Sequence, residues 1–416
     1  MEAVAPAWLT REYLEAALRQ HYADDHVKVK SVDFKPALKK GENYGAILTK
    51  IDLVYILGNG TEMEEHLMAK TALEDEDLDT KERKAPYDIY NRELEIYERV
   101  LPQLEKLAGE PLCPKVWHSD RQHGSLLMED LTYQGYKMAP RLQRLDGDHV
   151  RLVLKKLAKM QAASAVFESD CRDEKNSLKR YDRGFFNRYT ESFSAYFLGC
   201  LKSCASYLKT EPGFEKHAQL LEDLVPYYMG LGLRCFQPEA EHINVLTHGD
   251  AWTNNMMFKY EAGVPTDVLL IDFQYAFWGS PTLDIHHLVN TSAVERVRSD
   301  LQVEMRCVYH EVFVRELRRL GFKGQRLPSR KQFHLESEQK RFYAVHCGLL
   351  LQPVLLNTDD ADADFAALLS DQPRGMNMKR RLYLHAGIQD SVRQLVVQFE
   401  REGLLDPQQF EGFYAK

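Results

Sequence analysis

Two short apolar segments that each lead into an aspartate are the features that most constrain this chain. HINVLTHGD ends at Asp250, and DVLLIDF carries Asp272 directly after four aliphatic residues. Both segments interrupt a long region whose apolar residues recur at helical spacing, so we predict that they are buried strands. The fold must therefore place two carboxylates at strand ends within a mainly helical part of the chain.

The segment around Asp250 adds an amide to these acids. Asn255 follows Asp250 by five residues, across a turn. Phosphoryl transfer uses such a set: one carboxylate orients the acceptor hydroxyl and takes its proton, while another carboxylate and an amide oxygen hold Mg²⁺ against the phosphates. An Asp–Asn pair in a turn is also common as an Asx-turn or a helix cap, so the isolated pair leaves both interpretations open.

The first 130 residues predict a small antiparallel sheet with two helices. Thr10 is the expected cap of the first helix. The other predicted segments are strands at 26–37, 46–57 and 64–73, a charged loop at 74–84, a helix from about 86 to 101, and an apolar strand that begins at 124.

Glu93 lies within an apolar stripe of the predicted helix at 86–101. The other members of this stripe are Ile89, Ile96 and Val100. An unpaired buried carboxylate is costly, so Glu93 needs a partner.

The remainder of the chain is predicted to be mainly helical. The fold class is therefore α+β, and the chain is divided near Asp130 into an N-terminal lobe, residues 1–130, and a larger helical lobe, residues 131–416. The expected helices span residues 148–167, 183–208, 215–231, 298–321, 336–356 and 378–402, and residues 359–364 are expected to form a solvated surface turn.

Composition narrows the classes of function. The chain has 54 Lys and Arg against 62 Asp and Glu, a net charge of -8 that argues against broad nucleic-acid binding. No long uncharged apolar run and no signal-peptide core are present, so we expect neither a membrane span nor secretion. The seven cysteines form no C-x-x-C pair, and Cys200 and Cys204 have no nearby histidine pair, so we expect reduced thiols in a cytoplasmic protein.

LTHGDAWTNN followed by LLIDFQ resembles the catalytic loop and metal-binding strand of aminoglycoside and choline kinases, which are relatives of the protein kinases. Within that group, the H-G-D-x-W-x-x-N loop, the I-D-F-Q strand, LLMEDL and IYERVLP are most similar to the ecdysteroid kinase-like, or CHK-kinase-like, family. The resemblance extends over most of the chain. It implies a two-lobed protein-kinase-like fold and ATP-dependent phosphorylation of a small-molecule hydroxyl.

The resemblance also implies roles for the residues of the two motifs. Asp250 would be the catalytic base, and Asn255 and Asp272 would be ligands of Mg²⁺. His248 would brace the loop through backbone hydrogen bonds, and Asp284 is expected to be structural.

The nucleotide-binding residues would come from the first lobe. Lys70 would contact the ATP phosphates, and Glu93 would be its ion-pair partner, which supplies the partner that the apolar stripe requires. Adenine would stack against a hinge that consists of Met128, Glu129, Asp130 and Leu131. The phosphates would be covered by a loop that contains Gly41, Asn43, Tyr44 and Gly45, although its two glycines depart from the protein-kinase G-x-G-x-x-G pattern.

Other interpretations apply to several of these residues. Taken without the other motif residues, Lys70 could be a solvated lysine at a strand end, and Glu93 could be an exposed acid on a helix. Trp252 is expected to be a packing residue. His286 and His287 resemble a metal-binding pair, but adjacent residues on a helix point apart. Aromatic residues at 185, 186, 189, 193, 196 and 197 have the spacing of helical core packing, and lining an acceptor pocket is their second interpretation.

Several functions compete with a small-molecule kinase. The segment after Asp272 has no A-P-E-like stretch, which disfavours a protein kinase. A catalytically silent nucleotide- or ligand-binding protein and a metal-dependent hydrolase are further alternatives. The expected acceptor is an ecdysteroid or similar apolar alcohol, because residues 185–236 are rich in apolar side chains and have no acid cluster for a polycation. A choline- or aminoglycoside-type kinase is the alternative, since aromatic walls also bind quaternary ammonium groups. We expect no protein partner.

Overall fold

The computed structural model describes residues 5–37, 46–72, 78–358 and 365–408. The predicted phosphate-covering loop, with Gly41, Asn43, Tyr44 and Gly45, lies outside the described residues. The predicted surface turn at 359–364 lies outside them as well.

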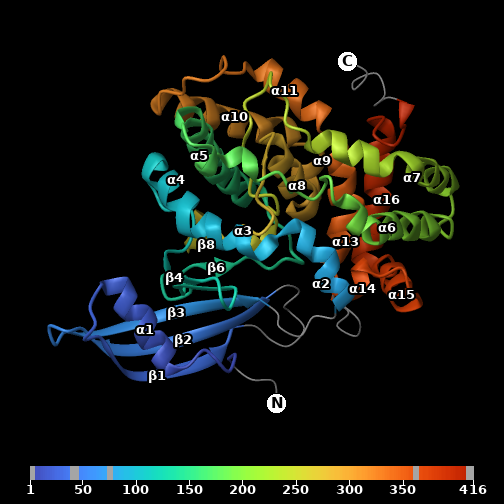
Figure 1. Ribbon diagram of the computed structural model, residues 1–416. Helices are drawn as coiled ribbons and strands as arrows, with labels where there is room; N and C mark the ends of the chain where they lie inside the picture. Colours follow the sequence, from blue (N-terminus) through green and yellow to red (C-terminus); the bar gives the residue numbers. More distant parts are fainter. Residues whose placement is uncertain (1–4, 38–45, 73–77, 359–364, 409–416) are drawn as a thin grey trace.

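A five-stranded antiparallel sheet forms the smaller lobe (Figure 1). Its order is β1-β2-β3-β5-β4, with β1 at Lys28–Pro36, β2 at Ala46–Ile56, β3 at Glu62–Ala72, β4 at Val116–Asp120 and β5 at Ser125–Glu129. Alternate side chains of β2 and β3 are buried, as expected for strands with one covered face. Helix α1 (Arg11–Tyr22) covers that face through Leu14 and Leu18, and Thr10 caps it by accepting a hydrogen bond from Tyr13 N–H at 3.2 Å.

The region after β3 is more helical than predicted. Residues 78–84 form helix α2 (Leu78–Lys84), so the prediction of a loop through residue 84 is wrong. Basic residues in its last turn stabilise the C-terminal end of this helix, because they complement the negative end of the helix dipole.

The predicted helix at 86–101 is also longer and less regular than expected. It begins with a short 3₁₀ turn, η1 (Ala85–Tyr87), and continues as helix α3 (Ile89–Glu95). A π-helical segment, η2 (Ile96–Val100), then leads into helix α4 (Leu101–Ala108). Leu101 N–H donates to Ile96 O, and Pro102 occupies the first turn of α4, where its missing N–H costs little.

Helices α3 and α4 lie along the edge of the larger lobe (Figure 1). Leu94, Tyr97 and Leu101 belong to the same buried cluster as Val153 and Leu157 of the large lobe. The helix that carries Glu93 thus shares its core with the large lobe, and the division of the chain at residue 130 stays a prediction.

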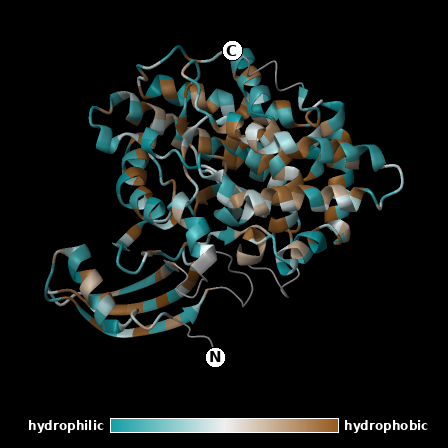
Figure 2. Cartoon of the chain, turned by 45° about the vertical axis from the view of Figure 1, so that its right-hand side comes forward, coloured by the Kyte–Doolittle hydropathy of each residue, from teal (hydrophilic) through white to brown (hydrophobic). Residues whose placement is uncertain are grey.

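The larger lobe is mainly helical, and its hydrophobic residues gather in the interior (Figure 2). Its helices are α5 (Gly147–Asp170), α6 (Ser194–Leu208), α7 (Glu215–Phe236), α8 (Thr282–Ser292), α9 (Glu295–Ser299), α10 (Gln302–Arg319), α11 (Arg330–Gln339), α12 (Phe342–Val345), α13 (Gln352–Leu355), α14 (Phe365–Leu369), α15 (Pro373–Leu382) and α16 (Ala386–Arg401). The small antiparallel sheet and the large helical lobe confirm the predicted α+β, two-lobed fold.

Three predicted helices are interrupted. Residues 183–193 form turns before α6, because Asn187 bonds the local backbone: its side chain donates to Gly184 O at 2.7 Å and accepts from Tyr189 N–H at 2.7 Å. The segment 336–356 contains a π-helical segment, His346–Leu351, between α12 and α13. A break separates α15 from α16 within 378–402.

Short strands of the large lobe lead into the two acidic motifs. These strands are β6 (Lys137–Met138), β7 (Val245–Leu246), β8 (Met256–Glu261), β9 (Val264–Leu270) and β10 (Trp278–Gly279). A hairpin of β8 and β9 was not predicted from the sequence. Its turn has positive φ at Ala262 and Gly263, 50° and 82°, which matches the twist of a tight hairpin. The hairpin brings Met256 opposite Leu270, and therefore brings the loop after Asp250 beside Asp272.

Candidate active site

Asp250 and Asn255 are in direct contact within the loop between β7 and β8. The Asn255 amide donates to the Asp250 backbone oxygen and to its carboxylate oxygen Oδ2, each at 2.9 Å. Ile271 N–H donates to Asn255 O at 3.0 Å, which ties this loop to the strand before Asp272. Because Asn255 Nδ2 is used on Asp250, its Oδ1 is the amide atom left to bind a cation.

His248 braces the same loop, as predicted. Asp250 N–H donates to His248 Nδ1 at 3.3 Å, and His248 Nε2 lies 3.0 Å from Ile271 O. Since Nδ1 accepts, the ring proton is on Nε2 and is donated to the Ile271 carbonyl. Complete burial lowers the pKa of His248, so the ring stays neutral. His248 is thus a structural link between the loop and the Asp272 strand.

Asp284 anchors the loop from helix α8. Its carboxylate accepts from His248 N–H at 2.6 Å and from Gly249 N–H at 2.9 Å. Gln161 of α5 donates to it at 2.7 Å. Burial raises the pKa of Asp284, while the backbone donors lower it. The expectation that Asp284 is structural agrees with these contacts.

Lys70 joins the two lobes through two carboxylates. Its Nζ lies 2.7 Å from Glu93 Oε1 and 2.9 Å from Asp272 Oδ1. The predicted contact between Lys70 and Glu93 is therefore confirmed. Burial would lower the pKa of Lys70, but Asp272 and Glu93 raise it well above its ordinary value, so the amine stays protonated. For Glu93, burial raises the pKa and Lys70 opposes that shift.

Asp272 has a left-handed backbone conformation, with φ of 68°. This conformation is unfavourable for a residue with a side chain, and such residues concentrate at functional sites. The Asp272 N–H donates to the Tyr97 hydroxyl at 3.2 Å, and Tyr97 lies in the π-helical segment after Glu93. The structure thus directs the Asp272 carboxylate toward Lys70 from a fixed backbone position.

A small pocket opens beside the Lys70–Glu93 pair. Ala46, Tyr90 and Leu126 are among its other lining residues, so it lies between the sheet and α3. A larger cavity, about 450 Å³, lies between α1, β4 and the π-helical segment, and it does not contain the two acidic motifs. Of these two cavities, the smaller one contains Lys70.

The predicted hinge, Met128 to Leu131, lies at the end of β5. The N–H groups of Glu129 and Asp130 already donate to backbone carbonyls, at 3.0 and 2.9 Å. Within the residues that the structure describes, the Leu131 N–H has no recorded acceptor.

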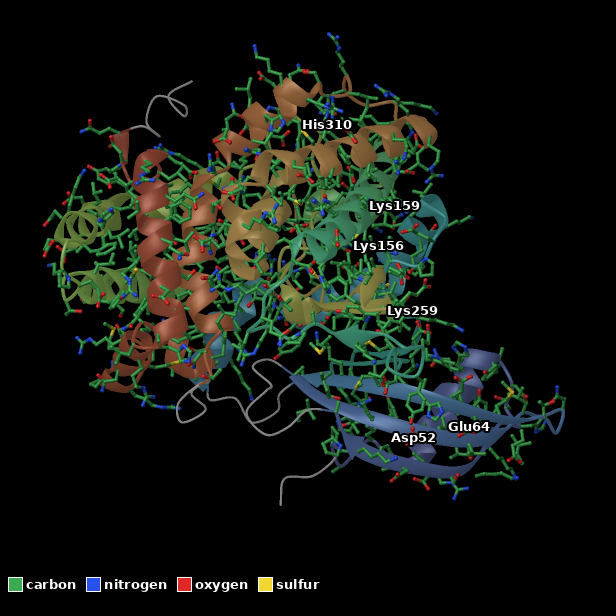
Figure 3. The ribbon with its side chains drawn as sticks, turned by 180° about the vertical axis from the view of Figure 1, so that it is seen from behind. Asp52, Glu64, Lys156, Lys159, Lys259 and His310 are labelled. Carbon is green, nitrogen blue, oxygen red and sulfur yellow. The ribbon has the colours of Figure 1, made fainter. Side chains whose placement is uncertain are left out.

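The Asp130 side chain is used within the hinge itself. It accepts from Thr132 N–H at 2.9 Å and lies 2.9 Å from Lys50 Nζ. A second acid, Asp52 on the sheet (Figure 3), accepts from the Tyr133 hydroxyl at 3.0 Å. These contacts fasten the hinge to β2.

The aromatic residues of the segment 185–197 are mostly core residues. Phe185, Phe186, Phe193, Tyr196 and Phe197 are at most 6% exposed, which agrees with core packing as their first interpretation. The remaining one, Tyr189, is half-buried.

The two adjacent histidines of α8 point apart, as expected. His286 Nε2 lies 2.8 Å from Ser337 O, and burial lowers the pKa of His286 to about 4. His287 instead lies against Asp250 and Tyr343. Among the described residues, no group of three or more His, Cys, Asp or Glu could hold a metal ion. The oxygen donors that fit a hard cation are the Asp272 carboxylate and the Asn255 amide.

Sequence reasoning missed two residues of this site. Arg92, next to Glu93, donates to Arg183 O at 2.6 Å and to Ala276 O at 3.1 Å. Burial lowers its pKa to about 10. His287 was considered as a metal ligand and not as a partner of Asp250. Its spacing of three residues from Asp284 was the available signal, because such residues share a helix face.

Comparisons with known proteins identify the family of this chain. The model of the ecdysteroid kinase-like family matches residues 40–322. No curated protein matches the sequence. One of the solved structures found is described as "Structure of the microcompartment-associated aminopropanol kinase"; it has 12% identity, covers 95% of this chain and 99% of its own, and gives a TM-score of 0.43. No helix in the described part of the chain has the length and apolar character to cross a membrane. The family match spans more than half of the sequence, and the chain therefore belongs to the ecdysteroid kinase-like family and is a phosphotransferase with an alcohol group as acceptor.

Proposed function

We propose that this protein transfers the γ-phosphoryl group of magnesium-ATP to a hydroxyl of an ecdysteroid or similar apolar alcohol. One observation carries the proposal: Glu93, Lys70 and Asp272 form a continuous set of contacts beside the loop of Asp250 and Asn255. A phosphate-binding cation, cation-binding oxygens and a potential base are the parts that phosphoryl transfer requires.

In the proposed reaction, the acceptor hydroxyl gives its proton to an Asp250 carboxylate oxygen. The acceptor oxygen forms a bond to the γ-phosphorus, and the bond from that phosphorus to the β,γ-bridging oxygen breaks, with its electron pair leaving on ADP. The Asn255 amide holds the Asp250 carboxylate by donating a hydrogen bond to Asp250 Oδ2. His248 and Asp284 keep the loop backbone in place.

Lys70 would neutralise phosphate charge in the same step. In the free protein its amine is held by Glu93 and Asp272. Asp272 and the Asn255 amide oxygen would hold Mg²⁺, which offsets the charge of the phosphate oxygens when it is bound. The Leu131 N–H and the buried Met128 side chain would meet adenine.

The surroundings of Asp250 support an apolar acceptor. Phe185 stacks on Tyr275 with ring centroids 4.6 Å apart, and the Phe185 ring lies 5.9 Å from that of His287, which contacts Asp250. Phe185 and Tyr275 are at most 6% exposed, so this wall is apolar packing behind Asp250, and it supports an apolar acceptor only through the apolar surroundings that it gives the carboxylate.

Charge near this wall argues against a polycation. The guanidinium groups of Arg183 and Arg188 lie 5.5 and 4.8 Å from the Tyr189 ring, on the segment that contains Phe185. Asp182 pairs with both arginines, so this segment offers no excess of acids to hold an aminoglycoside. A choline-like alcohol is the alternative acceptor, since a single quaternary ammonium group also binds aromatic faces.

Two measurements test the proposal. Calorimetry with ATP, with and without Mg²⁺, should show magnesium-dependent binding, and protein that binds no nucleotide would refute a kinase function. Mass spectrometry of products from ecdysone, choline and kanamycin should then show phosphorylation of ecdysone, with Asp250→Asn as the inactive control. Efficient phosphorylation of choline or kanamycin without that of ecdysone would show that the apolar-acceptor assignment is wrong.

A further inference from the structure

We propose that His287 is a positioning residue that fixes the Asp250 carboxylate through a hydrogen bond from its Nε2–H, with the Tyr343 hydroxyl holding the imidazole in the required tautomer. This inference rests on the proposed function, in which Asp250 is the base. It adds a third residue to the contacts that determine how Asp250 meets the acceptor.

The contact is formed in the interior of the large lobe. His287 Nε2 lies 3.3 Å from Asp250 Oδ1, and the His287 side chain is 1% exposed. The other ring nitrogen, Nδ1, lies 2.9 Å from the Tyr343 hydroxyl, which belongs to α12. Within the described residues, His287 Nε2 has no hydrogen-bond partner, and Asp250 Oδ1 is the carboxylate oxygen that lies 3.3 Å from it. A buried N–H without a partner is costly, so we infer that it is donated to Asp250.

The two neighbours determine where the imidazole proton lies. An ionised carboxylate only accepts hydrogen bonds, whereas a tyrosine hydroxyl can donate one. A neutral imidazole with its proton on Nε2 donates to Asp250 and accepts from Tyr343, which satisfies all three groups. The opposite tautomer would place the Nε2 lone pair against the carboxylate, a repulsive contact inside the protein.

With the proposed bond, each oxygen of the Asp250 carboxylate would have its own donor. Asn255 Nδ2 donates to Oδ2 at 2.9 Å from the loop, and His287 approaches Oδ1 from α8. Two donors from different elements prevent rotation of the carboxylate plane. Each oxygen keeps a lone pair that can accept the acceptor proton, so the carboxylate is oriented before the acceptor arrives.

His287 differs from an ordinary buried histidine in the residues that surround it. Its neighbour His286 bonds a backbone carbonyl, Ser337 O, and contacts no residue of the proposed reaction. The titratable groups around His287 are Asp250, Asp284, Tyr343 and His346. Two of these are the acids that form and support the loop.

The first test compares His287→Gln with His287→Met. The two side chains have nearly the same shape, but only glutamine has an N–H near the position of Nε2. Activity is measured as ADP formation from magnesium-ATP, with and without ecdysone. We expect His287→Met to lower kcat by about 10²-fold, the cost of a misplaced catalytic group, with little change in KM for ATP. His287→Gln should recover most of that loss. Equal kcat values for the two variants would overturn the proposal.

The matched control is His286→Met, on the same helix and equally buried. It should reduce thermal stability but leave kcat per folded molecule unchanged, because His286 has no contact with the loop. A similar loss of kcat in this control would mean that damage to α8, and not a missing bond to Asp250, explains the His287→Met result.

The second test does not depend on turnover. In protein with ¹⁵N-labelled imidazoles, the His287 signals, assigned by their absence from His287→Gln, should show a neutral ring with the proton on Nε2. A ring protonated on Nδ1 would overturn the inference. An inactive wild-type protein would refute the proposed function, and the catalytic role of His287 with it, while the Nε2–H signal would still support the proposed hydrogen bond to Asp250.

Discussion

Gly249 and Tyr275 are in direct backbone contact: a Cβ atom on Gly249 would lie 2.0 Å from the Tyr275 carbonyl oxygen. Gly249 also has φ of 80°, a conformation that favours glycine. The residue before Asp250 is therefore fixed by the segment that follows Asp272.

We predict that Gly249→Ala strongly reduces both stability and activity. The left-handed conformation alone costs an alanine roughly 1–2 kcal/mol, and the clash with Tyr275 adds to this because a carbonyl cannot move without the loop. Gly263→Ala is the matched control, since Gly263 has φ of 82° and open space around its Cβ position. Melting temperatures and ADP formation should show a much larger loss for Gly249→Ala, and equal losses would mean that the contact with Tyr275 is unimportant.

Asp250→Asn should bind magnesium-ATP normally and lose most of its transfer activity. The substitution keeps the shape of the side chain and removes its capacity to take a proton. General-base groups contribute about 10²–10⁴-fold, so kcat should fall within that range. Calorimetry measures the binding of magnesium-ATP, and the rate of product formation gives kcat, so the effects on binding and on transfer are measured separately. Turnover close to that of the wild-type protein would show that Asp250 is not the base.

Asp272→Ala should weaken the binding of magnesium-ATP. The variant loses a proposed oxygen ligand, so the gain in affinity that Mg²⁺ gives the wild-type protein should disappear. Titration of ATP with Mg²⁺ and with EDTA measures this difference directly. If the variant keeps the magnesium dependence of the wild-type protein, Asp272 does not hold the cation.

Lys70 and Glu93 should behave as one unit in a double-mutant cycle. Lys70→Ala and Glu93→Ala should each lower kcat/KM, and the double variant should cost much less than the sum, because the contact of 2.7 Å is already lost in each single variant. Coupling of less than about 0.5 kcal/mol, the usual limit for independent sites, would contradict this expectation.

His286 should make the protein sensitive to acid. Its pKa is lowered by burial to about 4 from an ordinary 6.5, so the unfolded state binds more protons than the folded state between these values. Stability from the neutral ring is therefore complete above pH 6.5 and is lost as the pH falls toward 4. The melting temperature of His286→Gln should depend less steeply on pH across that window than that of the wild-type protein, and parallel curves would contradict the assignment.

The sequence could predict where two carboxylates lie because each follows an apolar strand. Asp250 comes after β7 and Asp272 after β9, and the β8–β9 hairpin brings the loop of Asp250 beside Asp272. Glu93 could be recognised as a paired residue from its place in an apolar stripe. These inferences depended on local pattern and on the cost of burying charge, both of which are visible in sequence.

Other features depended on tertiary contacts that no local pattern contains. The turns at 183–193 arise where the Asn187 side chain replaces helical hydrogen bonds, although the aromatic spacing fits a helix. The π-helical segment after Glu93 is set by packing between the lobes. The bond between His287 and Tyr343 joins residues far apart in the chain.

The shared core of α3, α4 and the large lobe has a consequence for how the protein admits its nucleotide. Arg92 fastens α3 to the carbonyls of Arg183 and Ala276, whereas Lys70 belongs to the sheet. If the sheet swings outward, Lys70 travels with it and Glu93 stays behind. In such a motion the salt bridge would break, so it would act as a closure contact between the sheet and α3, and its loss would report each opening.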